Sequence, residues 1–152
     1  MKPLISVILP VWNGAEYLRD SINSILNQSF SDFELIVVND GSTDDTGIIL
    51  NEYSDDRIKV FTHHQNKGLI HSLNLAIAHA TGKYLARMDA DDISLPQRFE
   101  MQLEYLEKNP GTGVCGSFIK IPGEEEKISF FSSDREIRTA LLWQCELAHP
   151  AV

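Results

Sequence analysis

The chain has 152 residues, of which 43% are hydrophobic and 23% charged, and its formal net charge is −9. This composition is typical of a globular protein with a packed core, so we expect one domain over residues 1–152. The acidic balance argues against nucleic acid as a partner, because no cluster of Lys and Arg supplies the basic face required. No apolar run reaches membrane-spanning length and no signal peptide is recognisable, so the sequence predicts a cytoplasmic protein.

Apolar runs of strand length alternate with segments of helical period along most of the chain. The predicted strands cover residues 5–9, 33–38, 58–61 and 84–89, and the third predicted helix covers residues 68–80. Capping boxes are predicted for the first two helices, at Asn13 with Glu16 and at Ser42 with Asp45. This alternation indicates an α/β fold with a mostly parallel sheet flanked by helices.

The pattern becomes shorter and more polar toward the C-terminus. The elements predicted there are a helix opened by Ser94 and Pro96, a strand at residues 113–121, a paired strand at 128–131, and a helix capped by Ser133 and Glu136 that ends near Leu142. Residues 147–152 have the pattern of a further element that is just beginning, so we expect a domain truncated at its C-terminus. Apolar residues near Phe130 and Leu142 would then be partly uncovered, which predicts a homodimer or some aggregation.

Polar residues follow each of the four predicted strands, at residues 10–14, 39–44, 64–68 and 89–92. In a parallel sheet these loops share the edge where ligands bind. Asp40 could accept a hydrogen bond from a ribose hydroxyl or a base N–H, although for Asp40 and Gly41 taken alone an ordinary turn is the better explanation. Trp12 is predicted to be a packing residue.

Two carboxylates separated by one small residue end the fourth predicted strand. If residues 89–91 are extended, Asp89 and Asp91 leave the backbone on one side while Ala90 points to the other. Two acids that face one point require a cation, and a hard ion such as Mg²⁺ or Mn²⁺ completes its shell with substrate phosphates. A second interpretation remains open, in which Asp91, Asp92 and Ser94 only cap the following helix.

Glycine-rich phosphate loops are absent from the sequence. The segment after the first strand contains a single glycine, Gly14, where a dinucleotide-binding fold would carry Gly-x-Gly-x-x-Gly. The chain also has no Gly-x-x-x-x-Gly-Lys-Ser/Thr motif. We therefore expect phosphates to be held through a metal ion.

Four motifs in this order, SVILPVWNG, VVNDGSTD, NKG and DADD, resemble those of family 2 glycosyltransferases of the GT-A type. The similarity runs from about Leu4 to Pro110 and continues more weakly to His149 and Pro150. The resemblance implies a Rossmann-like GT-A fold and an inverting transfer of a sugar from a nucleotide diphosphate, usually UDP, with Mn²⁺ or Mg²⁺. The acceptor would be a glycan or a lipid-linked glycan, as in cell-envelope polysaccharide biosynthesis.

The resemblance also implies roles for individual residues. Donor-binding positions would be Pro10, Val11, Asn13, Asp40, Asn66, Lys67, Gly68, Asn74, Asp89 and Ala90. Asp91 would bind the metal ion, with Asp89 and His149 as further candidate ligands. Leu73 departs from the family pattern, since relatives often carry arginine there.

The catalytic base of the family is expected beyond Val152, so residues 1–152 should form the donor-binding part of a longer enzyme. Such an enzyme could associate peripherally with the inner face of the membrane to reach a lipid-linked acceptor. Two other functions stay open. One is a non-catalytic nucleotide-sugar-binding module, and the other is a nucleotidyltransferase, which would need a glycine-rich basic loop after the first strand.

Overall fold

A computed structural model of the chain describes residues 2–121, 123, 127–128, 132–141, 147–148 and 151–152. Its main element is a four-stranded parallel sheet with the order β3-β2-β1-β4. The strands are β1 (Ile5–Val11), β2 (Phe33–Asn39), β3 (Ile58–Thr62) and β4 (Tyr84–Arg87). Every residue of β1 and β2 is buried, as expected for central strands covered on both faces.

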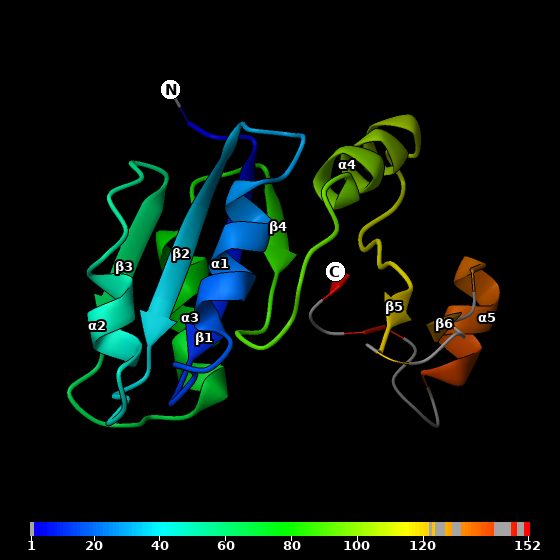
Figure 1. The fold of residues 1–152 in the computed structure, drawn as a ribbon. Helices are drawn as coiled ribbons and strands as arrows, with labels where there is room; N and C mark the ends of the chain where they lie inside the picture. The colour runs from blue at the N-terminus through cyan, green and yellow to red at the C-terminus, as the bar shows by residue number, and fades with distance from the viewer. Residues whose placement is uncertain (1, 122, 124–126, 129–131, 142–146, 149–150) are drawn as a thin grey trace.

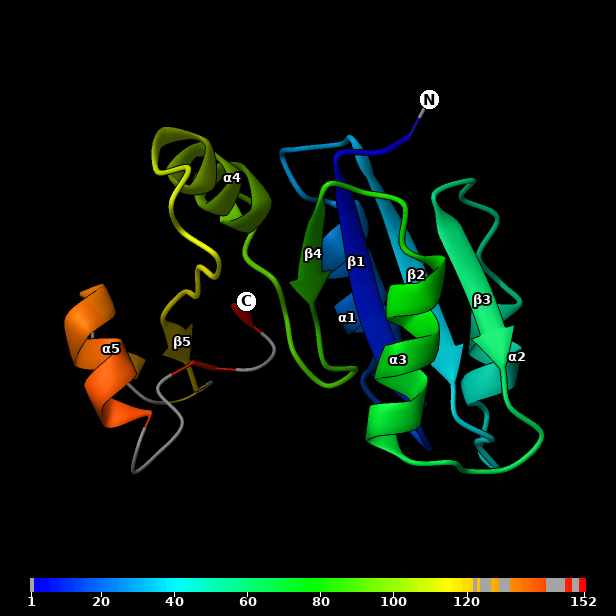
Figure 2. The same cartoon turned by 180° about the vertical axis from the view of Figure 1, so that it is seen from behind.

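Helices cover the two faces of the sheet unequally (Figures 1 and 2). The helices α1 (Leu18–Leu26) and α2 (Thr46–Leu50) lie on one face, and α3 (Leu69–His79) lies on the other. The larger core forms under α1 and α2, where Leu18, Ile22 and Ile25 pack against the sheet. Because α3 contributes mainly Ala76 and the half-buried Leu73 to the second core, its face of the sheet has the thinner apolar layer.

The remaining elements lie beyond β4, at the edge of the sheet (Figure 1). They are α4 (Arg98–Lys108), the antiparallel pair β5 (Ile119–Lys120) and β6 (Lys127–Ile128), and α5 (Asp134–Ala140). Phe99 anchors α4 to the larger core, where its ring meets that of Phe33 edge to face at 5.8 Å. The backbone N–H of Arg87 donates to Val152, so the last described residues lie beside the open edge of β4.

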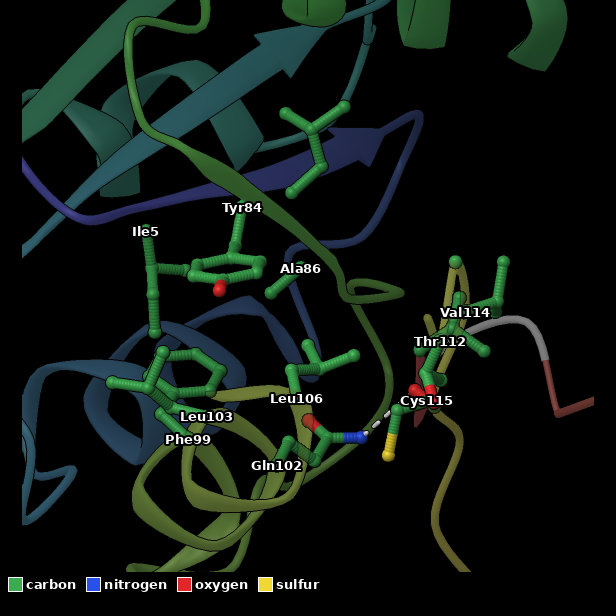
Figure 3. Close-up of a pocket in the computed structure, with 13 residues that line it drawn as sticks. Ile5, Tyr84, Ala86, Phe99, Gln102, Leu103, Leu106, Thr112, Val114 and Cys115 are labelled. Atoms are coloured by element: carbon green, nitrogen blue, oxygen red, sulfur yellow. Dashed lines mark hydrogen bonds between the residues drawn. The ribbon is translucent and has the colours of Figure 1, made fainter. Parts of the chain in front are cut away.

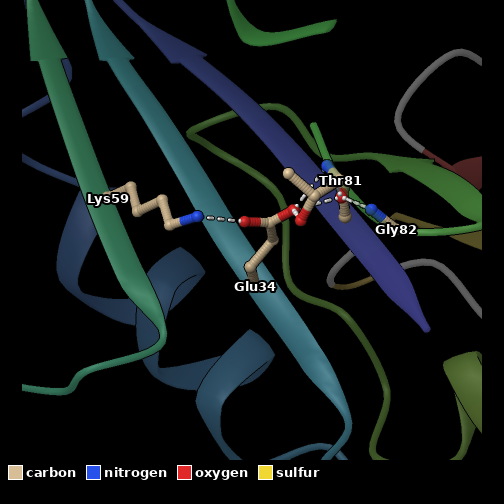
Figure 4. A network of polar contacts seen from close by, with 5 residues as sticks. Glu34, Lys59, Thr81 and Gly82 are labelled. Atoms are coloured by element: carbon tan, nitrogen blue, oxygen red, sulfur yellow. Dashed lines mark hydrogen bonds and ion pairs between the residues drawn. The ribbon is translucent and has the colours of Figure 1, made fainter. Parts of the chain in front are cut away.

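Glu34, at the amino end of β2, is buried and joins three strands (Figure 4). Its carboxylate accepts hydrogen bonds from Ser6 Oγ at 2.6 Å, Lys59 Nζ at 2.6 Å and the Thr81 backbone N–H at 2.8 Å. Burial alone would raise the pKa of Glu34, but these hydrogen bonds outweigh it and lower the pKa to about 2. The amino ends of β1, β2 and β3 are thus tied together around one carboxylate that is ionised at neutral pH.

The structure confirms the α/β fold, the order of its elements and the capping box of Ser133 with Glu136 at α5. The other two predicted capping boxes are wrong. Asn13 and Ser42 cap no helix, because their polar groups bond to each other's loops instead. Ser94 is not a cap either, since its hydroxyl accepts a hydrogen bond from Gln28.

Three further predictions about secondary structure need correction. The fourth strand ends at Arg87, and the strand expected at 113–121 is reduced to β5. The helical spacing of Leu69, Leu73, Ala76 and Ile77 predicts one apolar face, but Leu69 and Ile77 are about half exposed, because the buried face of α3 is centred on Ser72 and Ala76. Residues 129–131, part of the second predicted hairpin strand, lie outside the described residues.

No described helix is both long enough and apolar enough to cross a membrane.

Candidate functional site

The four loops that follow β1 to β4 meet at the carboxyl edge of the sheet. The loops after β1 and β2 are held together by reciprocal hydrogen bonds. Asn13 donates its backbone N–H to Ser42 Oγ at 2.9 Å, and its side-chain oxygen accepts the Thr43 N–H at 2.8 Å. Ala15 N–H donates to Asp44 Oδ2 at 3.0 Å. We call these contacts the loop latch, and in it Asn13 adopts a left-handed backbone with φ of 51°.

Asp40 connects the loop after β2 to the loop after β3. Its carboxylate oxygens accept the backbone N–H groups of Lys67 at 2.9 Å and Gly68 at 2.8 Å. Burial would raise the pKa of Asp40, but the hydrogen bonds from Lys67 and Gly68 hold it below its usual value. Each carboxylate oxygen has room for a second donor, so Asp40 can position the loop and still accept a hydrogen bond from a ligand.

Gly41 allows the loop after β3 to approach closely. Its φ is +68°, and a Cβ at this position would lie 2.4 Å from the Gln65 carbonyl carbon and 2.6 Å from Asn66 N. Only glycine accommodates both this backbone conformation and this contact without strain. The loop of residues 64–68 is therefore packed directly on the turn that carries Asp40.

A cavity of about 160 Å³ opens where these loops meet. Its lining residues are Pro10, Val11, Trp12, Asp40, Asn66, Leu69 and Ser72. Four of them were predicted as donor-binding residues from the sequence: Pro10, Val11, Asp40 and Asn66. Trp12 was predicted to be a packing residue, but its side chain is 57% exposed at the cavity.

The sequence reasoning missed Leu69 and Ser72, which belong to the first turn of α3. Both residues lie within four positions after Gly68, where α3 begins at this edge of the sheet. That position could have indicated that they line the site. Asn74 lies on an exposed part of α3 and is absent from the cavity lining. The Lys67 side chain is exposed, and only its backbone N–H takes part in the contacts with Asp40.

The acidic loop after β4 lies beside the loop after β1. A methyl group added at Gly14 would lie 3.6 Å from Ala90 Cβ, and Ser21 of α1 donates to the Asp89 carbonyl oxygen at 3.1 Å. Residues 89–91 are not extended as in a strand, so strand alternation does not place Asp89 and Asp91 on one side. The segment of residues 10–14 nevertheless borders both regions, because residues 10–12 line the cavity and Gly14 faces Ala90 of the acidic loop.

The three acids of this loop have different partners. Asp89 pairs with Arg87 at 3.1 Å, between Asp89 Oδ1 and Arg87 Nη2. Burial raises the pKa of Asp92, as do the negative charges of Asp91 and Asp89, whereas Arg98 opposes them. Asp91 is exposed and its carboxylate makes no hydrogen bond or ion pair with the residues that the structure describes.

Among the described residues, no three His, Cys, Asp or Glu side chains converge as a metal site. A cation shared with substrate phosphates needs fewer protein ligands, since Mg²⁺ is often held by one or two carboxylates and the phosphates. The unpaired Asp91 carboxylate, in a loop of like charge, fits that requirement better than Asp89, which Arg87 already neutralises. His149 lies outside the described residues.

A second cavity, of about 280 Å³, lies away from these loops between β4, α4 and residues 112–115 (Figure 3). Its lining is mainly apolar, with Tyr84, Phe99 and Leu103 among its walls, and Gln102 reaches across it to the Cys115 carbonyl oxygen at 3.4 Å. The described lining of this larger cavity contains no carboxylate and no group that could bind phosphate. We therefore take the smaller cavity beside Asp40 as the candidate site.

The sequence is similar to that of a known protein family. The family model "Glycosyl transferase family 2" matches residues 6–148. An uncharacterized glycosyltransferase of Haemophilus influenzae is 43% identical over 149 residues, which cover 97% of this chain and 45% of that protein. The chain thus spans less than half the length of this relative.

Two solved structures share the fold. One is S. aureus TarS 1-349 in complex with UDP-GlcNAc, with a TM-score of 0.72 and 27% identity over 88% of this chain and 39% of that chain. The other is the mannosyltransferase PcManGT from Pyrobaculum calidifontis in complex with GDP-Man and Mn²⁺, with a TM-score of 0.68 and 25% identity over 80% of this chain and 37% of that chain.

Proposed function

Because the chain belongs to glycosyl transferase family 2, we propose that it binds a nucleotide-diphosphate sugar for transfer to an acceptor hydroxyl, with inversion at the sugar. One observation carries this proposal. The loops after β1, β2 and β3 line a cavity with Asp40 in its wall, and the acidic loop of residues 89–92 lies beside the loop after β1. A nucleoside diphosphate needs two neighbouring sites, one that holds the base and one that balances the charge of the phosphates.

The nucleoside would occupy the cavity of about 160 Å³. Pro10 and Val11 form its apolar wall, Asp40 would accept the base N–H, and Asn66 would cover the base from the loop after β3. The ribose would approach Asp89 and Ala90. Lys67, on the same loop as Asn66, is exposed and would meet a phosphate as a point charge.

Asp91 would hold the Mn²⁺ or Mg²⁺ ion of the donor complex. When bound, such an ion stabilises the negative charge that develops on the diphosphate as the sugar departs. The Mn²⁺ present with GDP-Man in PcManGT supports a divalent ion in this family fold. Among the described residues, Asp91 is the acid of this loop without an internal cationic partner, which leaves its charge available to the ion.

The catalytic base that would deprotonate the acceptor is assigned to none of the described residues. We propose that this chain supplies the donor-binding part of the activity, with a glycan or lipid-linked glycan as the acceptor. Association with the inner face of the membrane and a homodimer are parts of the same proposal, for an enzyme that acts on envelope precursors.

Calorimetric titration of UDP into the 152-residue chain, with Mn²⁺ and again with EDTA, tests the proposal. We expect binding that weakens at least tenfold without the metal and in Asp91→Asn, because the diphosphate loses its counterion. Asp56→Asn removes an equally exposed acid outside the candidate site and should leave binding unchanged. Metal-independent binding that survives in Asp91→Asn would contradict the metal role, and binding without any sugar transfer by the whole protein would favour a non-catalytic module.

A further inference from the structure

Ser72 has a buried hydroxyl with no hydrogen-bond partner. The residue is 0% exposed, and its Oγ is one of three buried side-chain polar atoms without a partner among the described residues. It is near enough to Asp40 to lower the pKa of that carboxyl, yet its geometry falls outside that of a hydrogen bond. Buried hydroxyls are normally paired, so an unpaired one calls for a specific explanation.

The helix itself does not use this hydroxyl. A serine inside a helix can bond to the carbonyl oxygen four residues earlier, which for Ser72 belongs to Gly68. That carbonyl accepts the backbone N–H groups of His71 at 3.1 Å and Ser72 at 3.2 Å, and no bond from Ser72 Oγ accompanies them. Since helix propensity favours Ala over Ser, the serine at this position is no advantage to α3 alone.

The hydroxyl belongs to the wall of the candidate cavity. Ser72 lines it together with Asp40, one turn into α3 from the point where Gly68 begins the helix. Asp40, as an ionised carboxylate, can only accept hydrogen bonds, whereas the hydroxyl can donate one. The cavity therefore places an acceptor and a donor side by side on one wall.

We propose that Ser72 is a specificity-determining residue that donates its hydroxyl to a carbonyl oxygen of a uracil ring. In uracil, a ring N–H stands between two carbonyl oxygens, so the N–H can face Asp40 while a neighbouring oxygen faces Ser72. Cytosine has a bare ring nitrogen in place of that N–H, and an amino group in place of one carbonyl. The bare nitrogen of cytosine would face the Asp40 carboxylate, and two acceptors would then meet. The amino group of cytosine would face the Ser72 hydroxyl, which is placed to donate a hydrogen bond and not to accept one.

This inference rests on the proposed function, because it assumes that the cavity holds a nucleoside. The test compares Ser72→Ala with wild type by titrating UDP, CDP and GDP in the presence of Mn²⁺. These three ligands share the same diphosphate and metal, so differences between them report contacts with the base. The melting temperature of each ligand-free protein is measured in parallel.

We expect Ser72→Ala to weaken UDP binding about tenfold and to reduce the preference for UDP over CDP. The melting temperature of the ligand-free variant should be unchanged or higher, because the substitution removes an unpaired hydroxyl and introduces a better helix former. Ser24→Ala is the matched control. Ser24 Oγ donates to the Ser21 carbonyl oxygen at 2.7 Å and accepts the Ser94 N–H at 2.9 Å, so its loss should lower the melting temperature without affecting UDP binding.

Unchanged UDP affinity in Ser72→Ala would overturn this inference and leave the proposed function intact. An equal loss for all three nucleotides, together with a lower melting temperature, would also overturn it, since it would mark Ser72 as a structural residue. A wild-type chain that binds none of the three nucleotides would overturn both this inference and the proposed donor site.

Discussion

The two ends of the strands differ in whether every buried side-chain polar atom of the described residues has a hydrogen-bond partner. At the amino ends, the Glu34 carboxylate accepts hydrogen bonds from Ser6, Lys59 and Thr81. At the carboxyl ends, the described residues include three buried polar atoms without partners, namely His63 Nε2, Ser72 Oγ and Arg87 Nε. All the unpaired buried atoms in the described part of the chain therefore lie at the edge where the four loops meet.

This contrast separates stability from binding within one sheet. A paired buried group stabilises the fold, whereas an unpaired one costs about 1–3 kcal/mol until a ligand or water satisfies it. Residues at the amino edge should therefore govern unfolding, and residues at the carboxyl edge should govern nucleotide affinity. Three changes test this division, beginning with the largest expected effect.

Glu34→Ala should be the most destabilising of these changes. It removes the buried carboxylate that accepts hydrogen bonds from Ser6 Oγ and the Thr81 N–H, and it disturbs the bond from the Gly82 N–H to Ser6 Oγ. We therefore expect the free energy of unfolding to fall by about 3–5 kcal/mol. Urea denaturation measures this loss. UDP affinity under conditions where the variant is folded should stay within about twofold of wild type.

Glu52→Ala serves as the matched control. Glu52 pairs with Arg19, but both side chains are about half exposed, so the loss of stability should be small beside that of Glu34→Ala. Comparable destabilisation by the two variants, or a large loss of UDP affinity in folded Glu34→Ala, would break the comparison.

The pH dependence of stability should carry the signature of Glu34. Its pKa falls from 4.5 to about 2 on folding, so its contribution is fully present above pH 4.5 and is lost as the pH falls toward 2. At about 1.4 kcal/mol per pKa unit, this contribution is roughly 3 kcal/mol. Urea midpoints measured between pH 7 and pH 2.5 should decline less steeply in Glu34→Gln, which cannot titrate. Parallel declines in both proteins would assign the acid sensitivity to other carboxylates.

Gly41→Ala should lower both stability and UDP affinity, because Gly41 lies where two of the loops beside the cavity touch. The added methyl group would meet the backbone of Gln65 and Asn66 and require a left-handed conformation, so we expect about 2 kcal/mol of destabilisation. Calorimetry should show UDP binding at least tenfold weaker, because displacement of residues 64–68 breaks their bonds to Asp40.

Gly68→Ala separates backbone strain from the clash. Its φ is +91° and its ψ is 158°, a conformation that is nearly exclusive to glycine, but a methyl group there would have no atom within 4 Å, so only backbone strain of about 1–3 kcal/mol remains. Unchanged stability in Gly41→Ala beside a destabilised Gly68→Ala would mean that the close approach at Gly41 has no energetic weight.

The sequence was sufficient to predict the sheet and most of its helices, because β1 and β2 are near-continuous apolar runs and the helices have apolar residues at helical spacing. It was misleading where side chains had non-local partners. Asn13 and Ser42 have the spacing of local helix caps, but they bond to each other across 29 residues of sequence. Ser94 similarly bonds to Gln28, far away in the chain. Local spacing does not distinguish such contacts from caps, which depend on the packing of separate loops.

The candidate site was predictable as far as its motifs extend. Pro10, Val11, Asp40 and Asn66 follow predicted strands, and the structure gathers them around one cavity. Trp12 and Ser72 were not recognised, because their orientation depends on how β1 ends and on the rotation of α3. The pairing of Asp89 with Arg87 was also unpredictable from strand alternation, since the strand ends before Asp89.

The loop latch joins segments that are 29 or more residues apart through three hydrogen bonds, which link Asn13 to Ser42 and Thr43, and Ala15 to Asp44. Neither loop can unfold locally while the other keeps its bonds. We therefore expect the two loops to share one opening free energy, so that their amide hydrogens exchange with solvent as one cooperative unit.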